Sequence, residues 1–327
     1  MASHLDASKL QAFENAAAGH DGVLLDPSGE LVIKPCTPKE ISFYEQTVAN
    51  RPDFAELLPT YMGTLQLGAS EQAKELAPDD EVVKEGRLHG AKLATGTAIV
   101  LENLEHPFKR ANVLDLKLGA RLYADGTAPE KAARLDKVAS ETTTGSLNFR
   151  IAGMKVWNGS SYDVYDKFYG RKFSADSVRD GFTTFFTSLT SSLDPSEAAI
   201  ALETILADIT KARQLLQRSE SRMYGASILL VYEGDGAALK AILNGTQKTP
   251  APKADEKAPT PSELNEVEND EDDDSEDEAA PIGFLVKMID FAHAEWTPGQ
   301  GVDENVVQGL KNIEMQIERL VDRVAGV

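Results

Sequence analysis

Two charged side chains lie two positions apart in an otherwise apolar run, VLDLKLG. If this run is a strand, successive side chains point to opposite faces of the sheet. Leu114, Leu116 and Leu118 then share one face, which suits a core. Asp115 and Lys117 share the other face, which suits either water or a cleft. The rest of the chain has to decide between these two environments.

A second lysine lies at the end of an apolar run, ELVIK, and is followed by a segment that is expected to be helical. Lys34 ends that strand, and Glu40 and Glu45 lie on the helix. A strand lysine that faces a helix glutamate is how kinases hold nucleotide phosphates. The alternative is a lysine at a strand end that is exposed to water.

A carboxylate closes a third apolar run, GFLVKMID, at Asp290. Magnesium prefers hard oxygen donors and brings phosphates with it, so a carboxylate at a strand end is a natural magnesium ligand. The alternative is a helix or turn cap.

Backbone groups of LENL, residues 101–104, could pair with the edge of adenine at the end of another strand, but any residue type could do this.

The chain carries a formal net charge of −20, and this charge is unevenly distributed. The acidic residues are dense at 262–279 and milder at 71–86, whereas residues 131–172 are basic. The global charge argues against direct nucleic-acid binding, but such asymmetry can place an anion site on an acidic protein. Lys131, Arg134 and Lys137, spaced i, i+3, i+6, lie along one side of a helix. A solvated helix face is the alternative.

Other kinds of chemistry find little support in the sequence. Four of the histidines and the single cysteine show no metal-ligand spacing, which argues against a zinc site; these residues are His4, His20, His89, His106 and Cys36. One cysteine permits no internal disulfide and fits the cytosol or nucleus. No apolar run reaches the ~18–20 residues of a membrane span, and the first residues lack the features of a secretory signal.

The elements that must position these residues are predicted from the spacing of apolar residues and from turn and capping residues. Asp26-Pro27-Ser28-Gly29 suits a type I turn between two short strands, and Thr37-Pro38 caps a helix over 38–50. A second capping box is expected at Thr127-Ala128-Pro129-Glu130. Further strands are expected at 58–68, 97–104, 112–118, 146–157, 226–234 and 281–293, and further helices at 127–139, 175–190, 195–218 and 303–323.

These elements predict two lobes. Residues 1–104 form a β-rich lobe, a link follows near 103–108, and residues 105–327 form a larger mixed lobe. Residues 247–280 have almost no large apolar side chains, so they cannot bury enough surface to offset the entropy of ordering. We expect a disordered loop there, joining two strands that pair with each other.

The order of these motifs resembles the inositol polyphosphate kinase family, and within it the multikinases of fungi. The most specific stretch is VLDLKLG, which is similar to the family pattern Pro-x-x-x-Asp-x-Lys-x-Gly. Further matching stretches are ETTTGSLNFRIAGMKVW, YGR, ASILLVYEG and MIDFAH. The chain departs from the pattern at Ala111, where the family has proline, and at Ala226, which leaves Ser227 as the one hydroxyl of a Ser-Ser pair.

The resemblance implies an α+β fold with two protein-kinase-like lobes, antiparallel sheets in both, and ATP and Mg²⁺ between them. It implies a monomeric, ATP-dependent inositol polyphosphate multikinase that acts on inositol trisphosphate and tetrakisphosphate, in nucleus and cytoplasm. The implied ATP ligands are Lys34, Asp115 and the backbone of Glu102 and Leu104; the implied metal ligands are Asp290 and Ser227. The implied inositol phosphate ligands are Lys117, Lys131, Arg134, Lys137, Lys155, Lys167 and His293, within a binding segment at about 127–172.

Three questions stay open at this stage. Asp115 could bind the ribose or accept the proton of the attacking hydroxyl, and Lys117 would contact both the acceptor and the transferred phosphoryl group. A second activity in the same family, inositol hexakisphosphate kinase, is the nearest alternative. A scaffold in which the acidic loop binds basic nuclear partners is a third reading, and a solvated, variable loop is the simpler explanation of that segment.

Overall fold

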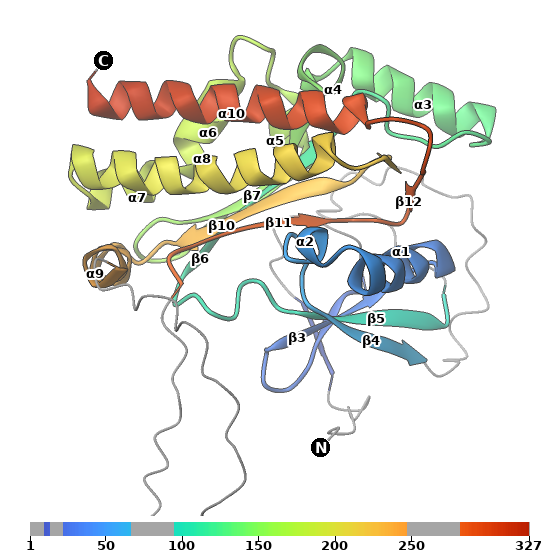
Figure 1. The fold of residues 1–327 in the computed structure, drawn as a ribbon. Helices are drawn as coiled ribbons and strands as arrows, with labels where there is room; N and C mark the ends of the chain where they lie inside the picture. Colours follow the sequence, from blue (N-terminus) through green and yellow to red (C-terminus); the bar gives the residue numbers. More distant parts are fainter. Residues whose placement is uncertain (1–9, 14–21, 67–94, 247–281, 327) are drawn as a thin grey trace, which may run out of the picture.

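The structure is a computed structural model that describes residues 10–13, 22–66, 95–246 and 282–326 (Figure 1). It contains two antiparallel five-stranded sheets with helices packed on them, which confirms the predicted α+β class. The acidic segments at 71–86 and 247–280 lie outside the described residues. Among the helices that the structure describes, none has the length and hydropathy to span a membrane.

The first sheet is small and has the strand order β1-β2-β3-β5-β4. Its strands are β1 (Gln11–Ala12), β2 (Leu24–Leu25), β3 (Leu31–Pro35), β4 (Tyr61–Gln66) and β5 (Thr97–Glu102). The predicted turn between β2 and β3 is confirmed, because the Gly29 N–H donates to the Asp26 carbonyl at 3.1 Å. Helix α1 (Pro38–Asn50) begins as predicted, where Thr37 accepts a hydrogen bond from the Glu40 N–H. A short helix, α2 (Pro52–Ala55), follows it.

The second sheet has the order β11-β10-β6-β7-β8, and every neighbouring pair is antiparallel. Its strands are β6 (Ala111–Leu118), β7 (Phe149–Trp157), β8 (Tyr162–Tyr165), β10 (Ser227–Glu233) and β11 (Phe284–Ile289). The predicted pairing of the two strands that flank the acidic loop is confirmed, since Ser227 lies opposite Ile289. A two-stranded ribbon, β9 (Ser221–Met223) with β12 (Ala294–Trp296), completes the lobe.

The helices that follow β6 are α3 (Pro129–Ser140), α4 (Thr143–Leu147), α5 (Lys167–Arg171), α6 (Val178–Phe185), α7 (Thr187–Ser192), α8 (Pro195–Gln217), α9 (Gly236–Thr246) and α10 (Glu304–Ala325). Most of them cover one face of this second sheet, whereas α9 lies at one end of the strands and α3 lies beyond the other end, beside α4 (Figure 1). Three expectations were wrong. The expected helix over 175–190 is two helices that meet at Phe186. Residues 146–147 end a helix rather than begin a strand. Thr127 does not cap α3, because its hydroxyl donates to the Ala124 carbonyl instead.

The opening question about VLDLKLG has a clear structural answer. Leu114, Leu116 and Leu118 are fully buried in the core under the helices. Asp115 and Lys117 point to the opposite face of β6, because strand side chains alternate. Side chains directly opposite each other on paired strands share a face, so Ser227 of β10 and Arg150 of β7, both opposite Lys117, belong to this face as well. We call it the cleft face.

The two sheets are held together by extensive packing. On α1, the ring of Phe43 stacks on Phe291 with centroids 4.6 Å apart and on Trp296 at 5.2 Å. The Met288 N–H of β11 donates to the Leu57 carbonyl at 2.7 Å. One core therefore contains residues of both sheets. The proposed lobe boundary at residue 104 stays a prediction, because the packing does not stop there.

Candidate functional site

Lys34 connects the small sheet to the large one. Its Nζ lies 2.8 Å from Glu40 Oε1 on α1 and 2.9 Å from Asp290 Oδ1, which follows β11. Burial disfavours the charged ammonium, but Asp290 and Glu40 outweigh it, so the pKa of Lys34 is raised. Glu40 also accepts the Phe291 N–H at 3.3 Å. One buried glutamate therefore holds both the lysine and the backbone beside Asp290, the residue whose φ of 67° is left-handed.

Lys117 approaches Asp290 from the other side. Its Nζ lies 3.3 Å from Asp290 Oδ2 and donates to the Gly225 carbonyl at 2.8 Å. The two oxygens of Asp290 thus bridge a lysine from each sheet. The structure therefore brings together three residues that are far apart in the sequence, as the resemblance implied: Lys34, Lys117 and Asp290.

Asp115 is a buried carboxylate whose surroundings shift its pKa. It is 3% exposed. Burial raises its pKa to about 6; Lys117 opposes the shift and Asp290 adds to it. Its Oδ1 is buried and makes no hydrogen bond within the described residues. A buried polar atom without a partner is costly and points to a ligand, an ion or a water. Asp115 is therefore prepared to contact something that enters the cleft.

The residues present fit a divalent cation. Asp290, Asp115 and the hydroxyl of Ser227 offer oxygen atoms, and the Ser227 hydroxyl is buried without a hydrogen-bond partner among the described residues. No group of three or more histidine, cysteine or acidic side chains gathers as a metal cage in the described part of the chain. Magnesium is usually held by one or two carboxylates together with substrate phosphates, so a full protein cage is not expected.

The predicted cations of α3 are exposed on their helix, and Lys137 Nζ lies 3.9 Å from Glu141 Oε1; these cations are Lys131, Arg134 and Lys137. His293 is exposed just beyond Asp290. Partial burial of the ring lowers the pKa of His293, and the positive charges of Lys131 and then Lys39 lower it further. Lys131 is therefore close enough to His293 to act on it electrostatically.

Two predicted ligands have other local partners. Lys155 lies opposite Val113 rather than opposite Lys117, and it is buried. Its ammonium group donates to the Glu105 carboxylate in the link between the sheets and lies 4.8 Å from the ring of Tyr162. Lys167 begins α5 and lies 5.6 Å from the ring of Phe168. Their sequence positions in the basic segment did not reveal these local partners.

Two further cations of the basic segment, Arg150 and Arg171, were not predicted as ligands. Arg150 lies opposite Lys117 and is 8% exposed. Burial and then Arg171 lower the pKa of Arg150 to about 10, while Asp115 opposes this. The Nε atoms of both arginines are buried without hydrogen-bond partners in the described residues. Arg150 and Lys155 are five positions apart, so simple alternation along β7 would place them on opposite faces of the sheet. The bulge between Gly153 and Ile151 brings both to the cleft face, and sequence alone did not predict this bulge.

An apolar floor lies next to the charged cluster on the cleft face. Val113 and Val231 are buried there with Phe108 of the link, and Leu229 and Leu285 are half-buried beside them. In the link, the Glu102 N–H donates to the Thr60 carbonyl at 3.1 Å and the Asn103 N–H donates to the Glu30 carbonyl at 2.7 Å. Leu104 follows in the link and is buried.

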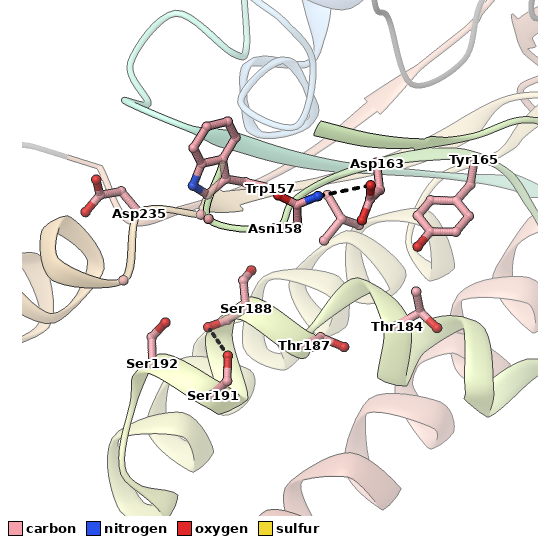
Figure 2. A pocket seen from close by; sticks show the side chains of 14 residues that line it. Trp157, Asn158, Asp163, Tyr165, Thr184, Thr187, Ser188, Ser191, Ser192 and Asp235 are labelled. Carbon is pink, nitrogen blue, oxygen red and sulfur yellow. Dashed lines mark hydrogen bonds between the residues drawn. The ribbon is translucent and has the colours of Figure 1, made fainter. Parts of the chain in front are cut away.

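A cavity of about 480 Å³ lies elsewhere, on the opposite face of the sheet (Figure 2). Figure 2 shows Asp163 and Tyr165 of β8 above Ser188, Ser191 and neighbouring hydroxyls of α7. Its lining contains two aspartates and no lysine or arginine. This lining is unsuited to a polyanion, so the charged cluster on the cleft face is the candidate site for phosphates.

Comparison with known proteins is consistent with this geometry. The family model described as inositol polyphosphate kinase matches residues 98–318. An inositol polyphosphate multikinase of Saccharomyces cerevisiae is 32% identical over 94% of this chain and 97% of its own length. That of Schizosaccharomyces pombe is 29% identical over 93% of this chain and 96% of its own length.

A more distant relative and a solved structure extend the comparison. Inositol hexakisphosphate kinase 1 of Mus musculus is 30% identical over 68% of this chain, but over only 52% of its own length. The crystal structure of an inositol phosphate multikinase from S. cerevisiae, in complex with ADP and Mn²⁺, superposes with a TM-score of 0.64 at 27% identity, covering 90% of this chain and 100% of that one. The chain is an enzyme of the inositol polyphosphate kinase family.

Proposed function

We propose that the chain is an ATP-dependent multikinase that transfers the γ-phosphoryl group of ATP to hydroxyls of inositol trisphosphate and then tetrakisphosphate. The observation that carries this proposal is the bridge made by Asp290, whose two oxygens lie 2.9 Å and 3.3 Å from the ammonium groups of Lys34 and Lys117. Phosphoryl transfer needs positioning and charge neutralisation more than covalent chemistry, and this bridge supplies both.

The nucleotide has a defined place in this proposal. The apolar floor of Val113, Val231 and Leu229 suits a purine ring. The Glu102 N–H is already used by Thr60, so we assign the adenine edge to the Glu102 carbonyl and the Leu104 N–H. Lys34 would bind phosphate oxygens. Because Glu40 and Asp290 keep Lys34 charged and fixed, little reorganisation is needed when the phosphates arrive.

Asp290, with Ser227 and Asp115 beside it, would hold the magnesium ion. That ion would neutralise charge on the phosphate oxygens. Lys117 lies between Asp290 and Arg150, so it would contact the transferred group and the acceptor. Asp115, with a pKa of about 6, is mostly ionised near neutral pH and can accept a hydrogen bond or a proton from a hydroxyl that reaches its free Oδ1. Ribose and acceptor hydroxyls are both chemically suitable.

The inositol phosphate would lie between Lys117 and α3. Lys131, Arg134, Lys137 and His293 are the proposed ligands from the helix and the rim. Arg150 adds a nearly buried cation whose Nε has no partner in the described residues, and such a group favours an anion. Flexible lysines around a small ring could accept more than one orientation, which would allow several hydroxyls to be phosphorylated.

The experiment is product analysis with purified protein, magnesium-ATP and inositol trisphosphate, with the phosphate positions of each product determined. Appearance of tetrakis- and pentakisphosphates supports the proposal, and absence of any transfer to the trisphosphate refutes it. A parallel reaction with inositol hexakisphosphate tests the second candidate, which is favoured by the similarity to the mouse hexakisphosphate kinase. A higher kcat/KM with hexakisphosphate would replace the first assignment with the second.

A further inference from the structure

Helix α3 carries three of the proposed substrate cations, and none of its side chains belongs to the buried core. None of its 12 residues is fully buried. Its C-terminal end is fixed because it leads directly into α4, where the Thr142 hydroxyl donates to the Val138 carbonyl at 2.7 Å. The half that carries Lys131 and Arg134 therefore depends on contacts along its length. A helix that is not anchored by a core has its orientation set by such surface contacts.

One such contact lies in the middle of the helix. The hydroxyl of Tyr123 donates to Asp136 Oδ2 of α3 at 3.0 Å. The guanidinium carbon of Arg121 lies 4.9 Å from the centroid of the Tyr123 ring and 5.2 Å from that of Tyr224. Asp125 holds the same guanidinium at 2.5 Å. We call Arg121, Tyr123 and Tyr224 the Arg121 stack; cation–π contacts of this kind are favourable.

The base of the stack is firmly attached to α10. The side chain of Asn305 exchanges two hydrogen bonds with the backbone of Arg121, each 3.0 Å long. Gly119 has a φ of +91°, and a Cβ there would lie 2.2 Å from Asn305 Nδ2. Only glycine allows the chain to turn this closely against Asn305. The position of Arg121 is therefore determined by the body of the protein.

The other end of the stack adjoins the catalytic cluster. The Tyr224 N–H donates to the His293 carbonyl at 3.3 Å, and the carbonyl of the next residue, Gly225, accepts the hydrogen bond from Lys117. A contiguous set of contacts therefore runs from Lys117 through Tyr224 and Arg121 to Tyr123, and from there to α3.

We propose that Arg121 and Tyr123 are positioning residues that hold α3, with its cations, at a fixed distance from Lys117. This inference rests on the proposed function, because the cations of α3 are assigned to the inositol phosphate. Loss of the stack leaves ATP binding intact, because the stack has no contact with Lys34, Glu40 or the apolar floor. It weakens only the capture of the polyanionic acceptor.

The test uses the full-length chain and the variant Tyr123→Phe, which removes one hydroxyl and keeps the ring. We expect the KM for inositol trisphosphate to rise about three- to tenfold, the scale of one typical hydrogen bond. The KM for ATP and kcat should stay within about twofold. In the absence of any substrate, the backbone amides of 130–140 should exchange with deuterium faster than in the wild type. Tyr165→Phe, at a half-buried tyrosine outside the stack, is the matched control. It should change neither the KM for inositol trisphosphate nor the deuterium exchange of α3.

A double-mutant cycle separates positioning from simple electrostatics. Asp136→Ala makes α3 more positive, which by itself would lower the KM for the acceptor, whereas loss of positioning raises it. We expect Asp136→Ala to raise this KM and the double variant to be no worse than Tyr123→Phe alone. The inference would be overturned if Tyr123→Phe left both the deuterium exchange of α3 and the KM for inositol trisphosphate unchanged. It would also be overturned if the KM for ATP and the KM for inositol trisphosphate rose equally. If the wild type transfers nothing to the trisphosphate, the proposed function fails, while the exchange measurement still decides whether the stack fixes α3.

Discussion

Replacement of Asp115 by asparagine should make the protein more stable while impairing the reaction. Burial and the neighbouring Asp290 raise the pKa of Asp115 from 3.8 to about 6, even though Lys117 acts in the opposite direction. A carboxyl with a raised folded-state pKa stabilises the fold most when it is protonated. Its contribution is fully present below pH 3.8, and it is lost as the pH rises through 6. At neutral pH the ionised form of Asp115 therefore lowers the free energy of unfolding.

The size of this destabilisation follows from the shift of the pKa. Two pKa units correspond to about 3 kcal/mol at pH 7.5, and linkage leaves about half of that at pH 5.0. Asparagine keeps the shape and removes the charge, so the free energy of unfolding should rise by about 1–3 kcal/mol at pH 7.5. The lower value applies if the new amide N–H finds no acceptor. The gain over the wild type should shrink as the pH falls.

Urea unfolding followed by the fluorescence of Trp157 and Trp296 at pH 7.5 and pH 5.0 measures this. Asp176→Asn, which neutralises an exposed carboxylate, is the control and should change the unfolding midpoint little at either pH. A variant at Asp115 that is less stable than the wild type at pH 7.5, or whose gain is the same at both pH values, would refute the reasoning. A fall of kcat by ~10²-fold or more would assign Asp115 to the attacking hydroxyl, whereas a raised KM for ATP with little change of kcat would assign it to the ribose.

The remaining predictions concern the cluster and the packing beneath it. Lys117→Ala and Asp290→Asn should each lower kcat at least ~10²-fold, and near-normal turnover in steady-state assays of either variant would contradict the site assignment. Arg150→Met should raise the KM for inositol trisphosphate by about tenfold or more while the KM for ATP stays constant; equal changes in both would show that Arg150 does not face the acceptor. Gly170→Ala should destabilise the protein by about 2–4 kcal/mol in urea unfolding, because its Cβ would lie 1.9 Å from the Ile151 carbonyl oxygen. An unchanged midpoint would mean that α5 can move away from β7.

The elements of the chain could largely be predicted from sequence, and local physics explains why. The run Leu114, Leu116, Leu118 alternates with Asp115 and Lys117, and that alternation by itself assigns two faces of a strand. Thr37 followed by proline starts α1 at the predicted residue, since the cap and the fixed φ act within one turn. Thr127 failed as a cap because its hydroxyl found a carbonyl three residues earlier, a choice between two local partners that sequence does not settle.

The meeting of distant residues was decided only by tertiary structure. Lys34 and Asp290 are 256 positions apart, and their 2.9 Å contact exists because α1 packs against the ribbon that follows β11. Lys155 has the same charge and lies in the same basic segment as Arg150, but strand register places Arg150 opposite Lys117 and Lys155 beside the link. Sequence determined which side chains could bear charge on the cleft face. Register, a bulge and the packing of the two sheets determined which of those charges point at one another, because each of these depends on contacts between segments that are remote along the chain.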